Sequence, residues 1–397
     1  MDPSLALFVS IFLILLLIRL RINVSVAIFI GALILGILTI SLNTFERMFL
    51  AITSYQTIRL LIIVISAFTL GFSMQELGLL KRLSATISGI VGKLSLVILP
   101  AIVGFLPMPG GALISAIMLT DLVRRYEVKS EEATFVNYWF RHLWVPIWPL
   151  YPSFIIGAMV VEVSYLKIMA ACYPVTVGMI LAGIVFLRNY SCSTARLSGS
   201  KVKIIKNLIL SLYPLMIVVV FAIILKIDLV ITLPFAVFML YLHKRPNTAK
   251  LKKILKKTLD PKIVILIFAV MFYKDLIEYT NSAQIFFNHL KELKFPTPIA
   301  AFLLTFVVGF AVGIEISYSA IALPLLTAFT GIGSEFVPKN LMLVFGAGLL
   351  GVMMSPLHLC LILTSEYYSA DLSKVYRYLI PAGIILISVV WITYLIC

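Results

Sequence analysis

The sequence predicts an all-α polytopic membrane protein whose two halves have opposite orientations in the bilayer. The first observation is composition: 62% of the 397 residues are hydrophobic and 12% are charged, whereas soluble domains are about half apolar and about a quarter charged. The second is that apolar runs of roughly bilayer length recur along the whole chain. The third is that these runs are interrupted at matching places in both halves.

The composition excludes several other classes of protein. So few charged residues exclude a soluble globular enzyme and a disordered chain. The cysteines form no CxxC pair, which argues against a zinc site and against a disulfide framework; they are Cys172, Cys192, Cys360 and Cys397. The net charge of +15 comes from basic residues between apolar runs, which is typical of cytoplasmic loops rather than of nucleic-acid binding.

The N-terminus predicts a retained first span, because Met1-Asp2-Pro3 lacks the basic region of a cleavable signal peptide. Together the apolar runs predict about ten transmembrane helices and two re-entrant hairpins. In the first half the runs cover 4–18, 24–42, 60–74, 94–122 (broken), 133–161 and 166–187. In the second half they cover 208–225, 229–242, 263–276, 297–329 (broken), 341–364 and 376–396.

The first broken run decides the topology. Its centre reads Pro107-Met108-Pro109-Gly110-Gly111, which cannot continue an α-helix, so the run is either a kinked span or a re-entrant hairpin. With a hairpin and both termini outside, most of the 32 Lys and Arg residues lie in cytoplasmic loops. A single crossing would instead place the basic loops 188–206 and 243–262 opposite those at 19–21 and 76–93. The positive-inside rule therefore favours the hairpin.

The two halves correspond in several features. Gly104-Phe105 of the first hairpin matches Gly309-Phe310 of the second, and an amphipathic stretch precedes each hairpin. The break at 146–152 matches the break at 355–358. Five spans per half, an odd number, place the second copy upside down. Discontinuous helices in matching places of inverted halves are typical of transporter binding sites, since unpaired backbone at membrane depth needs protein or water as its partner.

The runs 107–111 and 137–142, the latter leading into Pro146-Ile147-Trp148-Pro149, resemble the DUF401 group of uncharacterised permeases. That group is similar to the ion transporter superfamily, which includes divalent-anion/sodium symporters, gluconate permeases and arsenite pumps. The resemblance covers essentially the whole chain. It implies a homodimer that works by an elevator mechanism. The hairpin tips at 107–111 and 313–317 lack the Ser-Asn-Thr of the dicarboxylate branch, so neither sodium coupling nor a dicarboxylate cargo follows from the resemblance.

The resemblance also implies a division into scaffold and moving parts. The first half comprises a scaffold with its amphipathic arm (1–93) and a transport part (94–187, with hairpin 94–123 and broken helix 133–161). A cytoplasmic linker (188–206) joins it to the second half. That half comprises a scaffold with its arm (207–296) and a transport part (297–397, with hairpin 297–330 and broken helix 340–365).

Residues at the breaks are the candidates for binding a substrate. Gly110 and Gly111 begin a helix whose free N–H groups suit an anion, although a glycine break also permits tight packing. Arg141 suits a carboxylate, with snorkelling to the interface as the alternative. Trp148 and Tyr151 either contact the substrate in the cavity or are ordinary aromatic residues of the wall or interface. The full predicted substrate-binding set is Met108, Pro109, Gly110, Gly111, Arg141, Trp148, Tyr151, Ser317, Ser355 and His358.

Glu315 is the sharpest single candidate, because a carboxylate in an apolar run is costly unless it is paired, protonated or bound to a cation. With Ser317 it is the predicted ion-coupling site, for sodium or a proton. A structural salt bridge with Arg141 is the alternative. His142 is expected to be a packed or interfacial histidine.

Three functions compete. The first is a cation-coupled (Na⁺ or H⁺) secondary transporter of a small, carboxylate-like organic anion in the cell membrane. The second is a cation/proton antiporter of the same fold. The third, an intramembrane enzyme, is disfavoured because no HExxH, Asp-rich or P-loop motif is present. We expect no catalytic residues, no resident cofactor, no nucleic-acid partner and no metal site, since the four histidines lie far apart in sequence. The expected partners are the anion, the bilayer and a second copy of the chain.

Overall fold

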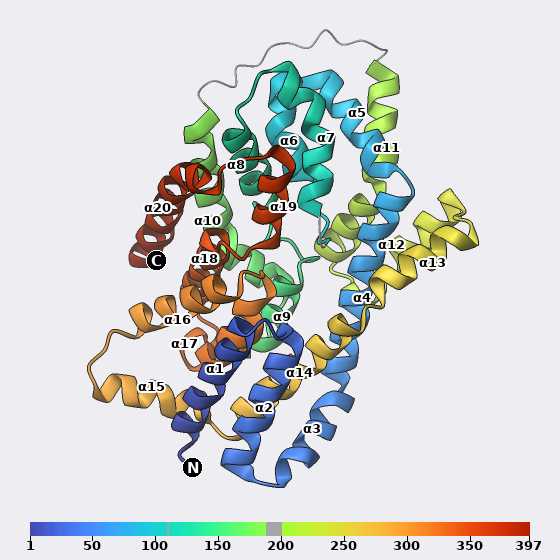
Figure 1. Cartoon of the computed structure of the whole chain (residues 1–397). Coiled ribbons are helices and arrows are strands. Elements are labelled where there is room, and N and C mark those ends of the chain that lie inside the picture. The colour runs from blue at the N-terminus through green and yellow to red at the C-terminus, as the bar shows by residue number, and fades with distance from the viewer. Residues whose placement is uncertain (109–110, 188–200) are drawn as a thin grey trace.

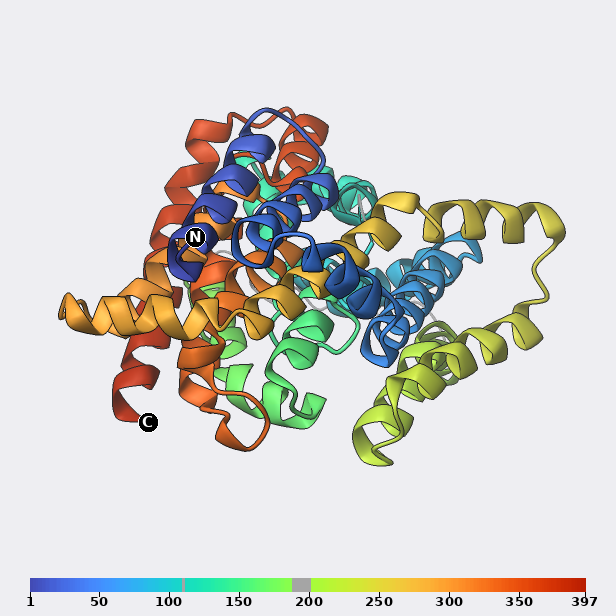
Figure 2. The same cartoon turned by 90° about the horizontal axis from the view of Figure 1, so that it is seen from below.

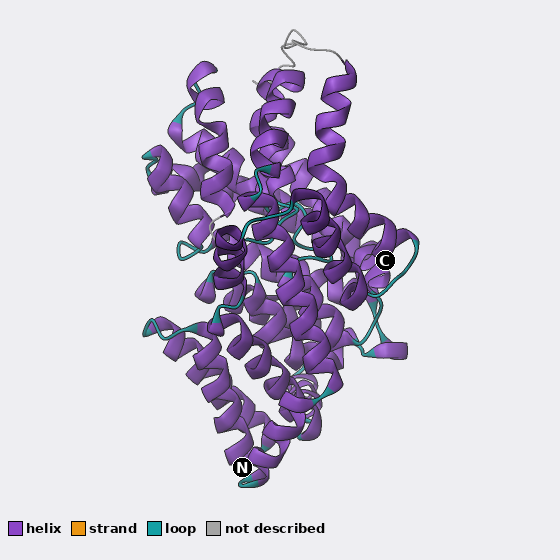
Figure 3. Ribbon diagram, turned by 90° about the vertical axis from the view of Figure 1, so that its right-hand side faces the viewer, coloured by secondary structure: helices purple, strands orange, loops and turns teal. Residues whose placement is uncertain are grey.

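The computed structural model describes residues 1–108, 111–187 and 201–397, and this part of the chain is helical with connecting loops (Figures 1 and 3). Within it, six stretches are long and apolar enough to cross a membrane, which agrees with a multi-pass membrane protein. They are Tyr55–Glu76, Leu79–Val103, Tyr165–Leu187, Val202–Ile224, Pro338–Tyr368 and Leu372–Ile396.

Ten helices make up the described part of the first half. They are α1 (Pro3–Arg19), α2 (Val24–Ile40), α3 (Asn43–Thr53), α4 (Tyr55–Glu76), α5 (Leu79–Val91), α6 (Ser95–Val103), α7 (Gly111–Arg125), α8 (Ser130–Arg141), α9 (Pro152–Val161) and α10 (Tyr165–Ile184).

Ten further helices belong to the second half. It contains α11 (Lys201–Val218), α12 (Leu229–Lys244), α13 (Thr248–Thr258), α14 (Pro261–Tyr279), α15 (Ser282–Glu292), α16 (Thr297–Val312), α17 (Thr327–Thr330), α18 (Pro338–Met354), α19 (Leu359–Tyr368) and α20 (Leu372–Ile396). A π-helical turn (Tyr318–Ala322) and a 3₁₀ turn (Leu323–Leu326) connect α16 to α17.

Acidic side chains begin several helices, because a carboxylate satisfies N–H groups that have no partner within the helix. Asp2 caps α1 and Asp371 caps α20. Asp371 accepts bonds from the backbone N–H of Ser373 (3.0 Å) and from its hydroxyl (2.6 Å). These bonds stabilise the ionised form and lower the pKa of the Asp371 carboxyl below its ordinary value.

The contacts between helices fall into two groups. In the first, α1 packs on α2 and α2 packs on α14, whereas α11 packs with α5 and α12 with α4. The second contains α6 to α10 together with α16 to α20; in it α16 packs with α18, both α10 and α18 pack with α20, and α6 packs with α8. Seen from below, the yellow-green to yellow α11 to α13 lie on the right, away from the red α20 on the left (Figure 2). Figure 1 shows the N-terminus and α3 at one end of the molecule and α5 at the other.

The helices are interrupted at all four places where prolines and glycines predict breaks. α6 ends at Val103, before Pro107-Met108, and α7 begins at Gly111 and packs back against α6. The other three interruptions separate α8 from α9, α16 from the π-helical turn, and α18 from α19.

Glycines allow α16 and α18 to touch through their backbones. A Cβ built at Gly351 would overlap the carbonyl oxygen of Phe306 and would lie 2.9 Å from the backbone nitrogen of Phe310. A clash with backbone atoms cannot be relieved by rotating a side chain, so the two helices would have to separate.

Gly351→Ala is therefore expected to lower the free energy of unfolding by about 1–3 kcal/mol, the usual range for overpacking a core. Thermal unfolding of the purified protein in detergent measures this change. Gly89→Ala is the matched control, because Gly89 is helical and no atom lies within 4 Å of a Cβ built there. Equal melting temperatures for the two variants would contradict close backbone packing of α16 on α18.

Candidate functional site

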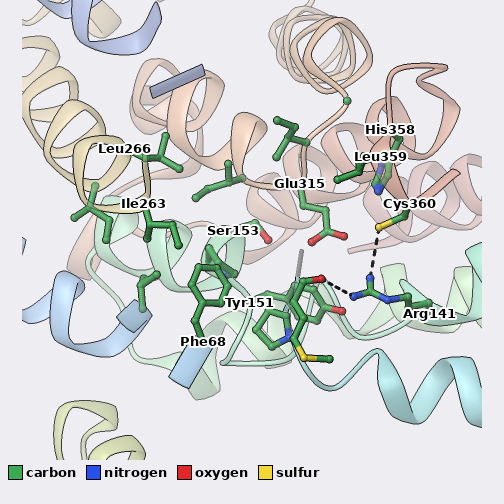
Figure 4. A pocket seen from close by; sticks show the side chains of 18 residues that line it. Phe68, Arg141, Tyr151, Ser153, Ile263, Leu266, Glu315, His358, Leu359 and Cys360 are labelled. Carbon is green, nitrogen blue, oxygen red and sulfur yellow. Dashed lines mark hydrogen bonds between the residues drawn. The ribbon is translucent and has the colours of Figure 1, made fainter. Parts of the chain in front are cut away.

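The four helix interruptions surround one cavity of about 340 Å³ (Figure 4). Val64 and Phe68 of α4 and three residues from the start of α14 form an apolar wall. The interrupted helices supply the polar groups. Lining residues from these breaks are Pro107, Met108, Arg141, Tyr151, Pro152, Ser153, Gly313, Ile314, Glu315, Ile316, His358, Leu359 and Cys360.

The connection between α8 and α9 satisfies carbonyls in the last turn of α6 and in the two residues after it, where no partner is available within the helix. Its donors are Trp144 Nε1 to the Ala101 carbonyl (2.8 Å), Trp148 Nε1 to the Phe105 carbonyl (2.8 Å) and the Tyr151 hydroxyl to the Gly104 carbonyl (2.5 Å). These bonds hold the irregular backbone between α8 and α9 in place against the end of α6. Trp148 and Tyr151 thus position the cavity wall.

Arg141 ends α8 and is 2% exposed. Its Nη2 donates to the Met108 carbonyl (3.2 Å), its Nη1 lies 3.8 Å from Cys360 Sγ, and its Nε has no hydrogen-bond partner. In the described part of the chain, no carboxylate lies within ion-pair distance of the guanidinium. A Cβ at Gly111 would overlap the guanidinium. The absence of a side chain at Gly111 therefore leaves space for the guanidinium beside the cavity.

Glu315 pairs with His142 rather than with Arg141. Its Oε1 lies 3.0 Å from Nε2 of His142, whose side chain is fully buried. The expectation of an Arg141 partner is therefore wrong. The expectation of a merely packed His142 is incomplete, because His142 follows Arg141 directly and the end of α8 turns it toward the tip that follows α16.

His142, His358 and Cys360 form a compact cluster in which one ligand atom of each residue lies within 4.8 Å of the others. The two imidazole rings are 4.9 Å apart. The expectation that the histidines are too distant to make a ligand cluster is thus wrong, because the end of α8 packs beside the start of α19. Sequence reasoning also missed Cys360 and Ser153; their position beside two breaks was the available signal.

Helix N-termini adjoin the cavity. α7 begins at Gly111, α9 at Pro152 and α19 at Leu359, and the last two residues line the cavity. Each N-terminus carries a partial positive charge and unpaired N–H groups. With Arg141 they favour an anion, and Glu315 is the one carboxylate among the described lining residues.

The predicted site residues fall into three groups. Met108, Arg141, Tyr151, Glu315 and His358 line the cavity, and Gly111 adjoins Arg141. Trp148, Ser317 and Ser355 do not line it. Trp148 Nε1 donates to the Phe105 carbonyl, Ser317 Oγ donates to the Ile314 carbonyl (2.7 Å), and Ser355 Oγ accepts from the Leu357 N–H (3.2 Å). Pro109 and Gly110 lie outside the described residues.

A comparison with protein families matches residues 2–397 to the family described as "Protein of unknown function (DUF401)". No curated protein matches the chain. The family match agrees with the resemblance carried by residues 107–111 and 137–149, and it extends over nearly the whole sequence. The chain therefore belongs to the DUF401 family and is a multi-pass helical membrane protein.

Proposed function

We propose that this protein is a secondary transporter that moves a small organic anion across the cytoplasmic membrane by alternating access. One observation carries the proposal: four interruptions of apolar helices line a single cavity beside a buried arginine that has no carboxylate partner. Interrupted helices are tolerated at membrane depth where they line a cavity, and in transporters they form the substrate site.

The cavity suits a carboxylate with a small apolar body. A volume of about 340 Å³ lies at the lower end of the range for small-molecule sites. Arg141 and the N-termini of α9 and α19 attract negative charge. Val64 and Phe68 on the opposite wall suit the apolar part of the substrate rather than a second charged group.

We propose that the helices form two inverted repeats, in which each helix of the first half corresponds to the helix ten later. The packing pattern supports this: α2 on α14 corresponds to α12 on α4, α6 on α8 to α16 on α18, and α1 on α15 to α11 on α5. Gly104 approaches the Arg141 carbonyl as Gly309 approaches that of Gly348. With this symmetry and the positive-inside rule, both termini are outside and the basic loops are cytoplasmic.

The repeats suggest which part moves. We assign α6–α10 and α16–α20 to a transport domain, and α1–α4 and α11–α14 to a scaffold that associates into a homodimer, as in the ion transporter superfamily. The cavity lies between the two, since α4 and α14 supply its apolar wall. Lys274 of α14 also pairs across this boundary with Glu162, directly after α9 (3.1 Å), and an elevator movement has to break that pair.

Glu315 gives the proposed transporter a place for a coupling cation. Its carboxylate faces the cavity close to where we place the anion, so a bound cation offsets the repulsion between the two negative charges. We propose that a gradient of Na⁺ or H⁺ drives uptake through this residue. Transport, rather than catalysis, is the proposed activity.

Uptake into proteoliposomes tests the function. The purified protein is reconstituted and offered a panel of labelled monocarboxylates and dicarboxylates, under an imposed sodium gradient or pH gradient. We expect saturable accumulation of at least one carboxylate above protein-free vesicles. Ion flux without any organic solute would favour the antiporter instead, and chemical turnover in detergent would favour an enzyme.

A further inference from the structure

The two clustered histidines present the same nitrogen to their surroundings. Nδ1 of His142 lies 2.7 Å from the Tyr138 carbonyl, and Nδ1 of His358 lies 3.3 Å from the Val352 carbonyl. A carbonyl only accepts hydrogen bonds, so each Nδ1 carries the proton. In the neutral ring this leaves a lone pair on Nε2, the arrangement that orients histidine ligands in metal sites.

The Nε2 of His142 lacks a hydrogen bond in its buried position. It faces the carboxylate of Glu315 at 3.0 Å, so with Nδ1 protonated, two electron-pair donors point at each other. A buried contact of this kind is unfavourable unless a positive centre lies between the atoms, and either a second proton on the ring or a metal ion supplies one. Cys360 Sγ adds a third donor atom in the same place.

We infer that His142, His358 and Cys360 bind a divalent cation of the zinc class, with the fourth position facing the cavity that His358 and Cys360 line. Two imidazoles and a thiolate are donor types that zinc prefers. Bonds of about 2.0–2.3 Å place tetrahedral ligand atoms roughly 3.3–3.8 Å apart. The cluster, within 4.8 Å, reaches that spacing through side-chain shifts of about 1 Å.

The ligands come from different breaks, so a bound ion connects segments far apart in the sequence. His142 follows α8, His358 directly precedes α19, and Cys360 lies in its first turn. A thiolate at Cys360 cancels one of the two charges of the ion, and the guanidinium of Arg141 lies 3.8 Å from its Sγ.

Cobalt titration of the full-length, tag-free protein in detergent tests the site after dialysis against a chelator. Co²⁺ reports on its own ligands: we expect about one equivalent to produce the visible bands of tetrahedral cobalt together with a thiolate-to-cobalt charge-transfer band. Zn²⁺ is expected to displace it.

Cys360→Ser is the decisive variant and Cys172→Ser its matched control, because both thiols are buried and only Cys360 belongs to the cluster. Cys360→Ser is expected to lose the charge-transfer band and to bind Co²⁺ at least about tenfold more weakly, with an unchanged elution volume in size exclusion. Cys172→Ser should keep the band. Absence of stoichiometric Co²⁺ binding by the unmodified protein, or a band that survives in Cys360→Ser, would overturn the inference. No transport is measured, so failure of the transporter proposal remains a separate result.

Discussion

Replacing Arg141 with lysine is expected to reduce the initial rate of carboxylate uptake about 30-fold or more. Disturbing one partner of a buried, hydrogen-bonded charge pair costs about 2–5 kcal/mol. Lysine keeps the positive charge but loses the planar fork that binds a carboxylate through two parallel bonds. The expected loss therefore reports on geometry as well as on charge.

The surroundings of Arg141 explain why lysine is a poor substitute. The guanidinium spans from the Met108 carbonyl to Cys360 Sγ and still has Nε without a partner. An ammonium group is a single point that cannot reach both neighbours and the cargo. Arg141→Lys keeps a positive charge at this position. Any change in the folding of the variant therefore does not come from the removal of a buried charge.

Arg47→Lys is the matched control. Arg47 makes a forked pair with Asp275 through Nε (2.9 Å) and Nη2 (2.5 Å), and it does not line the cavity. We expect its uptake to stay within a few-fold of the unmodified protein, because partly exposed ion pairs contribute about 0–1 kcal/mol. If both arginine variants transported equally well at equal protein content, Arg141 would not bind the cargo.

The membrane class and the positions of the helix breaks could be predicted from the sequence, because both depend on local chemistry. Long apolar runs can be recognised without knowledge of the neighbouring segments, and closely spaced prolines and glycines, such as those at 107–111, interrupt a helix where a single proline such as Pro174 does not. Matching breaks in the two halves then indicated that distant segments meet. That inference placed Arg141, Glu315 and His358 in one candidate site before any contact was known.

The partners within the site could not be predicted, because they depend on how the breaks fold against each other. His142 and Glu315 are far apart in the sequence, and nothing in their spacing indicates that their side chains lie 3.0 Å apart. Trp148 resembles a substrate-binding aromatic, yet its indole N–H donates to the carbonyl of Phe105, which follows α6. Cys360 carried no motif at all. It joins the cluster only because α19 begins beside the end of α8.

Glu315→Gln is expected to abolish accumulation driven by a cation gradient while leaving carboxylate exchange intact. Glutamine has nearly the same shape but lacks the negative charge that a coupling cation neutralises. A tenfold sodium gradient stores about 1.4 kcal/mol per ion, enough for roughly tenfold accumulation of an uncharged complex. The variant should lose this accumulation, so that the cargo reaches equal concentrations inside and outside the vesicles.

Two measurements on the same proteoliposomes separate coupling from binding. Accumulation is measured with and without the sodium gradient, and again with a pH gradient. Counterflow, in which unlabelled cargo inside exchanges for labelled cargo outside, is measured without any gradient. Exchange needs the cavity and the movement of the transport domain but no net cation flux, so we expect Glu315→Gln to retain it.

Glu76→Gln provides the control for loss of a carboxylate. Glu76 pairs with Lys253 (2.8 Å) and Lys257 (2.9 Å) of α13 and does not line the cavity. This variant should keep both accumulation and exchange. If Glu315→Gln still accumulated cargo in response to either gradient, the coupling charge would lie elsewhere, and the Glu315–His142 contact would be structural. Loss of exchange as well would instead place Glu315 in the cargo site itself.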